Sequence, residues 1–93
     1  MTVTRINEFE AAAGKAEELF QFLMTLKDYI AASKGCELCE VLRKNDNDAV
    51  FVVIEKWDSK ESHKQSIEAY PQEKMAEAMP LFGLPPKGAY YHN

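Results

Sequence analysis

The chain has 93 residues, a formal net charge of −4 and 46% hydrophobic residues, which suits a single domain over residues 1–93. No apolar run approaches the roughly 18 residues of a membrane-spanning helix, and an acidic chain with scattered Lys and Arg is a poor candidate for binding nucleic acid or an anionic membrane. Residues 1–10 lack the basic and apolar regions of a signal peptide, so we expect a cytoplasmic protein.

The first part of the chain predicts a strand followed by a helix. Residues 2–10 are rich in β-branched and aromatic side chains, which favour a strand. Asn7 is disfavoured within a strand, so it either faces solvent at a sheet edge or has a specific partner. Residues 14–33 carry apolar side chains at helical spacing, and Gly35 then supplies a left-handed residue that caps this helix.

A hairpin is predicted next. Asn and Asp residues at 45–48 form a turn between the strands 36–44 and 49–57. The second of these strands is apolar on both faces: one carries Val50, Val52 and Ile54, and the other carries Phe51, Val53 and Trp57. Glu55 shares the face of Trp57, which places its carboxylate either near the rim of the sheet or inside a polar pocket.

The remaining residues predict a second helix in two pieces and a last strand. Asp58 and Glu61 have the spacing of a capping box at a helix start. Pro71 ends that piece and stands at the first position of the next one. With a short strand at 89–93, the order is β-α-β-β-α-β. This is the ferredoxin-like α+β fold: one antiparallel sheet, the first and third strands central, and both helices on one face.

The uncovered face of this sheet predicts a partner. Two helices can cover only one face, yet the third strand is apolar on both, although the first two strands are less uniformly apolar. Monomers seldom expose a large apolar patch. We therefore expect a homodimer in which two copies pack sheet to sheet about a two-fold axis.

Cys36 and Cys39 are the only cysteines in the chain. Their odd spacing in a strand predicts that they point to opposite faces. Two cysteines do not make a zinc site without further ligands at ordinary spacing, and a redox pair is expected at the start of a helix. We interpret them as reduced structural thiols.

Trp57 and His63 are the first candidates for a functional site. They flank the corner between the third strand and the second helix, so both side chains could face one cavity. There His63 would act as a general base, as a hydrogen-bond donor to an anionic substrate, or as a haem ligand. The alternative is that Trp57 anchors the core and His63 lies on the helix surface.

Asn7 and Glu55 extend this group, because they lie on the two strands expected at the centre of the sheet. With Tyr90 or Tyr91 from the last strand, they would form a mostly apolar pocket with a few polar groups. The chain has no nucleophile elbow, glycine-rich phosphate loop, dinucleotide-binding motif or set of four metal ligands. Hydrolase, kinase and nicotinamide-dehydrogenase functions therefore lack support.

Four segments, in their order and spacing, resemble the antibiotic biosynthesis monooxygenase (ABM) domain family. They are GKAEEL at 14–19, GC at 35–36, VIEKWDSKESH at 53–63 and PKGAYY at 86–91. The resemblance covers nearly the whole chain, and its most specific part is the E-x-W-x-S segment followed by a helical histidine. It implies a ferredoxin-like fold whose dimers form an α+β barrel. Some members oxidise aromatic polyketides with oxygen alone, some degrade haem, and others act on quinols or small signalling molecules.

In the haem-degrading branch, an Asn on the first strand, a Trp and a helical His shape the site. Asn7 and Trp57 resemble the first two, but His63 lies closer to its Trp than in that branch. The position nine residues after Trp57, common for His in the wider family, is Ser66. Haem ligation is therefore disfavoured, and the spacing resembles instead a subgroup for which the resemblance supplies no substrate.

The resemblance thus implies a monooxygenase, free of cofactors, for a small aromatic, phenolic or quinol substrate. His63 would deprotonate or orient the substrate hydroxyl, and Asn7 would bind a carbonyl or the developing oxyanion. The substrate would be bound by Trp57, Glu55, Phe51 and Tyr90. Two alternatives stay open: a non-catalytic dimeric module that binds a small ligand, and a haem-binding or haem-degrading protein.

Overall fold

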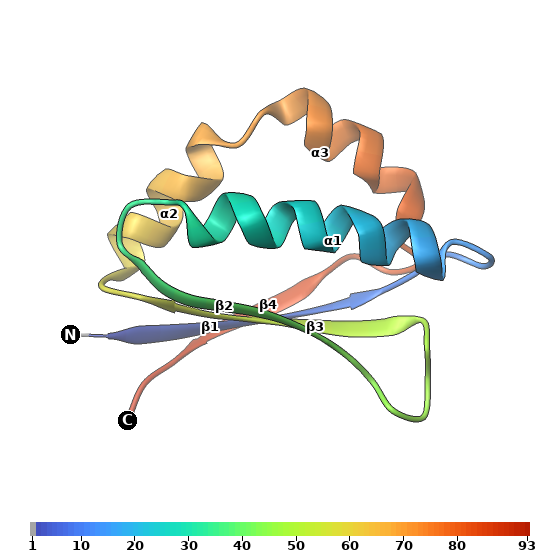
Figure 1. Ribbon diagram of the computed structural model, residues 1–93, viewed down its shortest axis with the longest axis horizontal. Coiled ribbons are helices and arrows are strands. Elements are labelled where there is room, and N and C mark those ends of the chain that lie inside the picture. The colour runs from blue at the N-terminus through green and yellow to red at the C-terminus, as the bar shows by residue number, and fades with distance from the viewer. Residues whose placement is uncertain (1) are drawn as a thin grey trace.

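The computed structural model describes residues 2–93 and contains one antiparallel sheet with the strand order β2-β3-β1-β4 (Figure 1). In chain order the elements are β1 (Val3–Glu10), α1 (Ala16–Ala31), β2 (Cys36–Arg43), β3 (Val50–Trp57), α2 (Lys60–Ala69), α3 (Gln72–Ala78), the 3₁₀ helix η1 (Met79–Leu81) and β4 (Lys87–Tyr91). The predicted ferredoxin-like α+β fold is confirmed, with the second helix divided into α2 and α3. The central strands are β1 and β3, as predicted.

The helices all lie on one side of the sheet, with α2 and α3 forming an arch beside α1 (Figure 1). The most deeply buried apolar side chains come from β3 and from the inner face of α1: Phe51, Val53, Trp57, Leu19 and Leu23. Every other residue of β3 points toward the helices, because successive side chains of a strand alternate between its faces. The solid core of the domain therefore lies between β3 and α1.

The end of α1 differs from the prediction. The helix ends at Ala31 with Ala32 as its C-cap, so Gly35 does not cap it. Gly35 does have a left-handed backbone, with φ +88°, and it turns the chain into β2. A Cβ at this position would lie 2.5 Å from Ser62 Oγ, so the close approach of α2 also requires glycine.

The start of α2 also differs. Ser59, not Asp58, is the N-cap, and its Oγ accepts a hydrogen bond of 3.2 Å from the backbone N–H of Ser62. Asp58 instead accepts a 2.6 Å hydrogen bond from the Ser62 hydroxyl. At the break between the helices, Pro71 is the N-cap of α3 rather than its first residue. The chain thus leaves α2 in an extended conformation before α3 begins.

The prediction that the two cysteines point to opposite faces is wrong. The pairing of β2 with β3 shifts between Cys36 and Leu38, so that Cys36 lies opposite Trp57 and Cys39 opposite Glu55. This bulge adds one residue to β2 and returns both cysteines to the helix-covered face. Both are free thiols, and burial raises the pKa of Cys39 to about 12.

The other face of the sheet is not covered by any element within residues 2–93 (Figure 1). Leu38, Leu42 and Tyr91 are 36%, 49% and 52% exposed, and Val52 and Ile54 lie between them half-buried. The last strand begins and ends two residues earlier than predicted, because Lys87 pairs with Glu8. In the part of the chain that the structure describes, no helix could cross a membrane.

Candidate functional site

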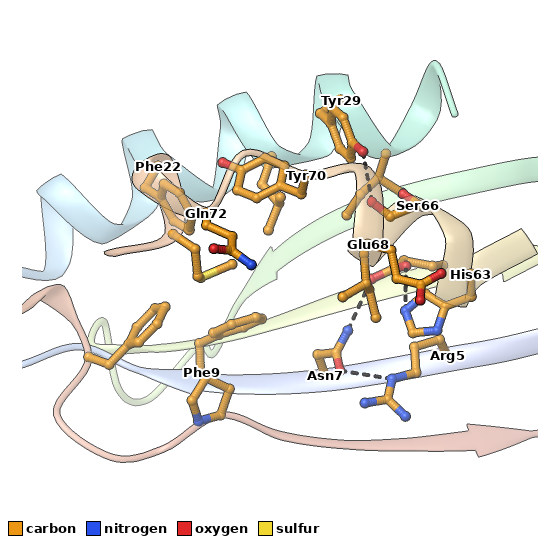
Figure 2. Close-up of a pocket in the computed structure, with 17 residues that line it drawn as sticks. Arg5, Asn7, Phe9, Phe22, Tyr29, His63, Ser66, Glu68, Tyr70 and Gln72 are labelled. Carbon is orange, nitrogen blue, oxygen red and sulfur yellow. Dashed lines mark hydrogen bonds and ion pairs between the residues drawn. The ribbon is translucent and has the colours of Figure 1, made fainter. Parts of the chain in front are cut away.

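A cavity of about 500 Å³ lies on the helix-covered side of the sheet, between β1 and the three helices. Figure 2 shows Arg5, Asn7 and His63 gathered at one end of it, and Phe9 and Phe22 at the other. Further apolar lining comes from Leu26, Ile30, Met75 and Phe82. The cavity therefore has one polar end and mostly apolar walls, which is the usual form of a small-molecule site.

Glu55 is the centre of the polar end. Its side chain is 2% exposed because β3 carries it on the helix-covered face. Its Oε1 accepts a 2.8 Å hydrogen bond from Trp57 Nε1, and its Oε2 accepts a 3.0 Å bond from Asn7 Nδ2. Burial raises the pKa of Glu55, although these two donors and the charge of Arg5 oppose that rise. Of the two positions that the sequence left open for Glu55, the structure shows the one inside a polar pocket and not the one near the rim of the sheet.

Asn7 connects Glu55 to Arg5. Its Nδ2 donates to Glu55, and its Oδ1 accepts a 3.0 Å hydrogen bond from Arg5 Nε. Because β1 is a central strand, Asn7 is not at an edge. The structure therefore supports the interpretation in which this amide has specific partners, and both ends of the carboxamide are used.

His63 is 4% exposed, so the alternative that it lies on the helix surface is wrong. Its Nδ1 lies 2.7 Å from Tyr90 Oη, and its Nε2 lies 3.7 Å from Glu55 Oε1. Burial, and secondarily the charge of Arg5, lowers the pKa of His63 to about 4, so the ring is neutral at pH 7. A proton on Nε2 faces the Glu55 carboxylate, and this tautomer leaves Nδ1 to accept from the Tyr90 hydroxyl.

The six predicted site residues fall into two groups. Asn7, Glu55 and His63 line the cavity. Trp57 and Phe51 are 0% exposed and stand behind the lining, and Tyr90 contacts His63 from β4 without lining the cavity. The apolar walls expected from Trp57 and Phe51 are provided instead by Phe9, Phe22 and Phe82. Trp57 contributes its N–H to Glu55 and a ring centred 5.5 Å from that of His63.

Sequence reasoning missed Arg5, which lines the polar end. The signal for it was present: Arg5 and Asn7 are two residues apart on β1, so a charged residue shares the face of the Asn7 that the sequence placed in the candidate pocket. It also missed Tyr29 and Tyr70, whose rings meet edge to face at 4.9 Å beside the cavity. The Tyr29 hydroxyl donates a 2.7 Å hydrogen bond to the backbone carbonyl of Ser66 and so ties α1 to α2.

The polar end does not suit haem. Both ring nitrogens of His63 face protein groups, Tyr90 on one side and Glu55 on the other. An axial ligand needs an unprotonated ring nitrogen with a free lone pair, whereas in this tautomer Nε2 carries the proton and Nδ1 accepts from Tyr90. Among residues 2–93, no three His, Cys, Asp or Glu side chains are grouped to hold a metal ion.

The profile of the antibiotic biosynthesis monooxygenase family matches residues 2–77. A candidate antibiotic biosynthesis monooxygenase from Nitrosomonas europaea has a similar structure: TM-score 0.90, 16% identity, covering 99% of this chain and 89% of that one. SnoaB, a cofactor-independent oxygenase from Streptomyces nogalater solved as a mutant, is similar with TM-score 0.85, 17% identity and coverages of 99% and 92%. A protein from Pseudomonas aeruginosa is similar with TM-score 0.89 and 20% identity, covering 99% of this chain and 93% of that one. At these identities the similarity shows the fold alone. No curated protein matches the sequence significantly.

Proposed function

The chain belongs to the antibiotic biosynthesis monooxygenase family, and from this premise we propose that it oxygenates a small phenolic or quinol substrate without a cofactor. The observation that carries the proposal is the group formed by the buried Glu55 and His63 and the half-buried Asn7 at one end of an otherwise apolar cavity. A solved structure of the same fold is that of a cofactor-independent oxygenase, which supports the absence of a cofactor.

The shape of the cavity supports a ring-shaped substrate. About 500 Å³ is within the range of small-ligand sites. Phe9, Phe22 and Phe82 offer aromatic surface to the apolar part of a substrate. The hydroxyl of such a substrate would then be directed to the polar end, because only there can it replace the hydrogen bonds it made with water.

At the polar end, three side chains have separate roles in our proposal. The neutral His63 orients the substrate hydroxyl through its Nε2–H, and the Glu55 carboxylate, whose pKa is raised by burial, accepts the hydroxyl proton. Asn7 stabilises the resulting oxyanion together with its neighbours. Deprotonation makes the ring electron-rich enough to react with oxygen directly.

For 1-hydroxynaphthalene, whose ring carbon para to the hydroxyl carries a hydrogen, the reaction balances without a reductant. The ring carbon para to the oxyanion bonds to one atom of O₂, and the peroxide formed takes up a proton. Loss of the hydrogen on that carbon and cleavage of the O–O bond then give a naphthoquinone and water. All the electrons that reduce oxygen come from the substrate, one oxygen atom enters the product and the other leaves as water.

The test is oxygen uptake with a panel of hydroxynaphthalenes and quinols. We expect turnover of at least one of them, and a loss of about 10²–10⁴-fold in His63→Ala, as for other residues that assist proton transfer. His92→Ala is the matched control, since His92 is exposed and outside the cavity. Equal uptake by the wild type and His63→Ala would remove the role assigned to His63.

A second candidate function is a non-catalytic module that binds a small ligand. It is favoured by the way in which the polar side chains satisfy one another: Asn7 uses both ends of its amide, and Glu55 uses both oxygens. Such a cluster can shape a cavity without doing chemistry. Saturable binding of the same panel, with no oxygen uptake by any member, would favour this function over the first.

We also propose that the protein is a homodimer joined through the uncovered face of the sheet. The exposed Leu38, Leu42 and Tyr91 on that face support this arrangement. Leu42→Glu should reduce the solution mass from dimer to monomer. Met79→Glu is the control, because Met79 is similarly exposed, at 56% against 49%, but lies in η1 on the helix side. A monomeric wild type at micromolar concentration would contradict the proposal.

A further inference from the structure

We infer that Arg5 makes the polar end of the cavity a binding site for an oxyanion, either the carboxylate or the phenolate of an aromatic ligand. The inference rests on the proposed function only in taking this cavity as the ligand site. It does not depend on oxygen chemistry. The chain as a whole is acidic, so attraction of an anionic ligand must come from the immediate surroundings of Arg5.

The guanidinium of Arg5 is held on two sides. Its Nε donates a 3.0 Å hydrogen bond to Asn7 Oδ1, drawn as a dashed line in Figure 2. Its central carbon lies 4.7 Å from the centre of the Tyr90 ring, so one face of the guanidinium stacks on that ring. These contacts use the Nε atom and one face of the Arg5 guanidinium. Within residues 2–93 the two terminal nitrogens have no hydrogen bond or ion pair with the protein.

A glycine provides the space for this arrangement. Gly88 on β4 pairs with Asn7, and its backbone lies directly against the Arg5 guanidinium. A Cβ at Gly88 would lie 2.7 Å from the central carbon of the guanidinium, and it would meet Asn7 Oδ1 and an Arg5 terminal nitrogen even more closely. The position of Arg5 over the strand is therefore available only because residue 88 has no side chain.

The carboxylate nearest in register does not neutralise Arg5. Glu55 pairs with Arg5 across the two central strands, yet it makes no ion pair with Arg5 in the described chain. Its oxygens instead accept from Trp57 and Asn7. The planar edge of a guanidinium presents parallel N–H donors that match the two oxygens of a carboxylate. An incoming oxyanion is thus offered donors that the protein itself leaves unused.

The rest of the lining accommodates the ring of the ligand away from this end. Phe9, Phe22 and Phe82 form apolar walls that suit an aromatic ring. Glu68 lines the cavity from α2 and is drawn beside His63 in Figure 2, but within residues 2–93 it makes no ion pair with Arg5. An aromatic ligand with one oxyanion can therefore satisfy both parts of the cavity only with its charged group beside Arg5.

The experiment compares matched probes by calorimetry in the absence of oxygen. 2-Naphthoate should bind the wild-type protein about ten- to a hundredfold more tightly than the neutral 2-naphthamide, as for a hydrogen bond to a charged group. Arg5→Gln should abolish that ratio, whereas Arg5→Lys, which keeps the charge without the planar edge, should retain part of it. 4-Nitrophenol, compared just below and just above its own pKa, distinguishes a phenolate from a carboxylate preference.

Lys60→Gln is the matched control. The Lys60 ammonium lies 5.1 Å from the centre of the Tyr90 ring that Arg5 also contacts, but Lys60 does not line the cavity. This variant removes one positive charge near the site and should keep the ratio. Equal binding of the two naphthalene probes by the wild type, or an unchanged ratio in Arg5→Gln, would overturn the inference.

The outcome is separable from that of the proposed function. If the oxygen-uptake panel fails but 2-naphthoate is preferred, the cavity is an anion site without the proposed reaction. If neutral phenols are oxygenated and neither oxyanion is preferred, the reaction stands and the role of Arg5 does not. Should Arg5→Gln fail to fold, Arg5→Lys replaces it, and an undiminished ratio in Arg5→Lys would overturn the role of Arg5.

Discussion

The helix-covered face of the sheet is built in two ways. Where α1 packs on it, the helix contributes Leu19 and Leu23, both 0% exposed, and the space is filled. Where α2 approaches it, the buried residues of the helix are His63 and Ser66, and a cavity of about 500 Å³ remains. The same sheet face thus has a packed half, where α1 contributes Leu19 and Leu23, and a hollow half, where α2 contributes His63 and Ser66 beside the cavity.

The difference lies in the helices more than in the strands. β3 supplies Phe51 and Val53 to the packed half and Glu55 to the hollow half, with the same alternation throughout. The α2 sequence, KESHKQSIEA, has few apolar residues with which to fill the space below it. The break at Tyr70 and Pro71 then carries α3 on in a new direction. The stability of the domain should therefore depend on the α1 half and its ligand specificity on the α2–α3 half.

Truncating one side chain in each half provides the largest expected contrast. Leu23→Ala leaves a void in the packed half and should lower the free energy of unfolding by about 3 kcal/mol. Met75→Ala, at a residue 36% exposed on the cavity wall, should cost about 1 kcal/mol or less, because no closed void is created. Denaturant unfolding measures both. Similar losses for the two variants would mean that the cavity half is also a stabilising core.

A second test uses acid, because the hollow half contains the buried histidine. The folded state holds the pKa of His63 at about 4, against an ordinary value of 6.5. Between these values the unfolded chain binds more protons, so the contribution of His63 is complete above the ordinary value and is lost as pH falls toward 4. From about pH 7 to about pH 5 the wild type should lose about 2 kcal/mol more than His63→Asn.

Two features keep this measurement specific. The raised pKa of Glu55 acts in the opposite direction, since its protonated form is favoured on folding, but both proteins carry Glu55. The difference between the two curves therefore isolates His63. His92→Asn, at an exposed histidine, should follow the wild-type curve. Parallel curves for wild type and His63→Asn would show that His63 titrates alike in the folded and unfolded chain.

The same contrast explains which features the sequence predicts. The strands and α1 follow from apolar periodicity, and the central position of β1 and β3 follows from the element order. Asn7 and Glu55 could be placed side by side on that basis. The prediction that Phe51 and Trp57 form walls of the cavity was wrong, because both are packed behind its lining. Apolar periodicity shows that a residue points inward, but not whether its side chain meets a neighbour or a cavity.

Two local errors have a similar physical cause. The bulge that returns Cys36 to the face of Cys39 depends on how β2 pairs with β3, which no pattern within β2 reveals. The capping of α2 by Ser59 depends on competition among adjacent polar side chains, and Asp58 is instead held by the Ser62 hydroxyl. Both are decided by contacts between segments or by fine geometry rather than by residue preference.

Gly88→Ala should damage the hollow half without affecting the packed one. The added methyl group displaces the ends of the Arg5 and Asn7 side chains from the cavity, and the hydrogen bonds that they lose should cost about 1–2 kcal/mol. The preference for 2-naphthoate over 2-naphthamide should fall with it. A double-mutant cycle with Arg5→Gln tests the mechanism, since Gly88→Ala should have less effect on the ratio once Arg5 is absent. Additive effects would indicate that Gly88 acts by another route.

The smallest expected effect is the most informative about His63. Tyr90→Phe removes the hydroxyl that lies 2.7 Å from His63 Nδ1 and should cost about 1 kcal/mol of stability, the usual value of one hydrogen bond. If Tyr90 donates to Nδ1, the wild-type ring carries its proton on Nε2, facing Glu55. Nitrogen-15 NMR of histidine-labelled protein reports this directly, because protonated and unprotonated ring nitrogens have distinct shifts. The Nε2–H population should fall in Tyr90→Phe.

Tyr91→Phe is the matched control, since Tyr91 is the next residue but lies 52% exposed on the opposite face of the sheet. It should change neither the tautomer of His63 nor the stability of the monomer fold. A wild-type spectrum with the proton on Nδ1 would reverse the direction of the Tyr90 hydrogen bond and leave Nε2 as a base rather than a donor. In that case His63, not Glu55, would take the substrate proton. The chemistry of the hollow half would still depend on a histidine that is positioned by a hydrogen bond with Tyr90 of β4.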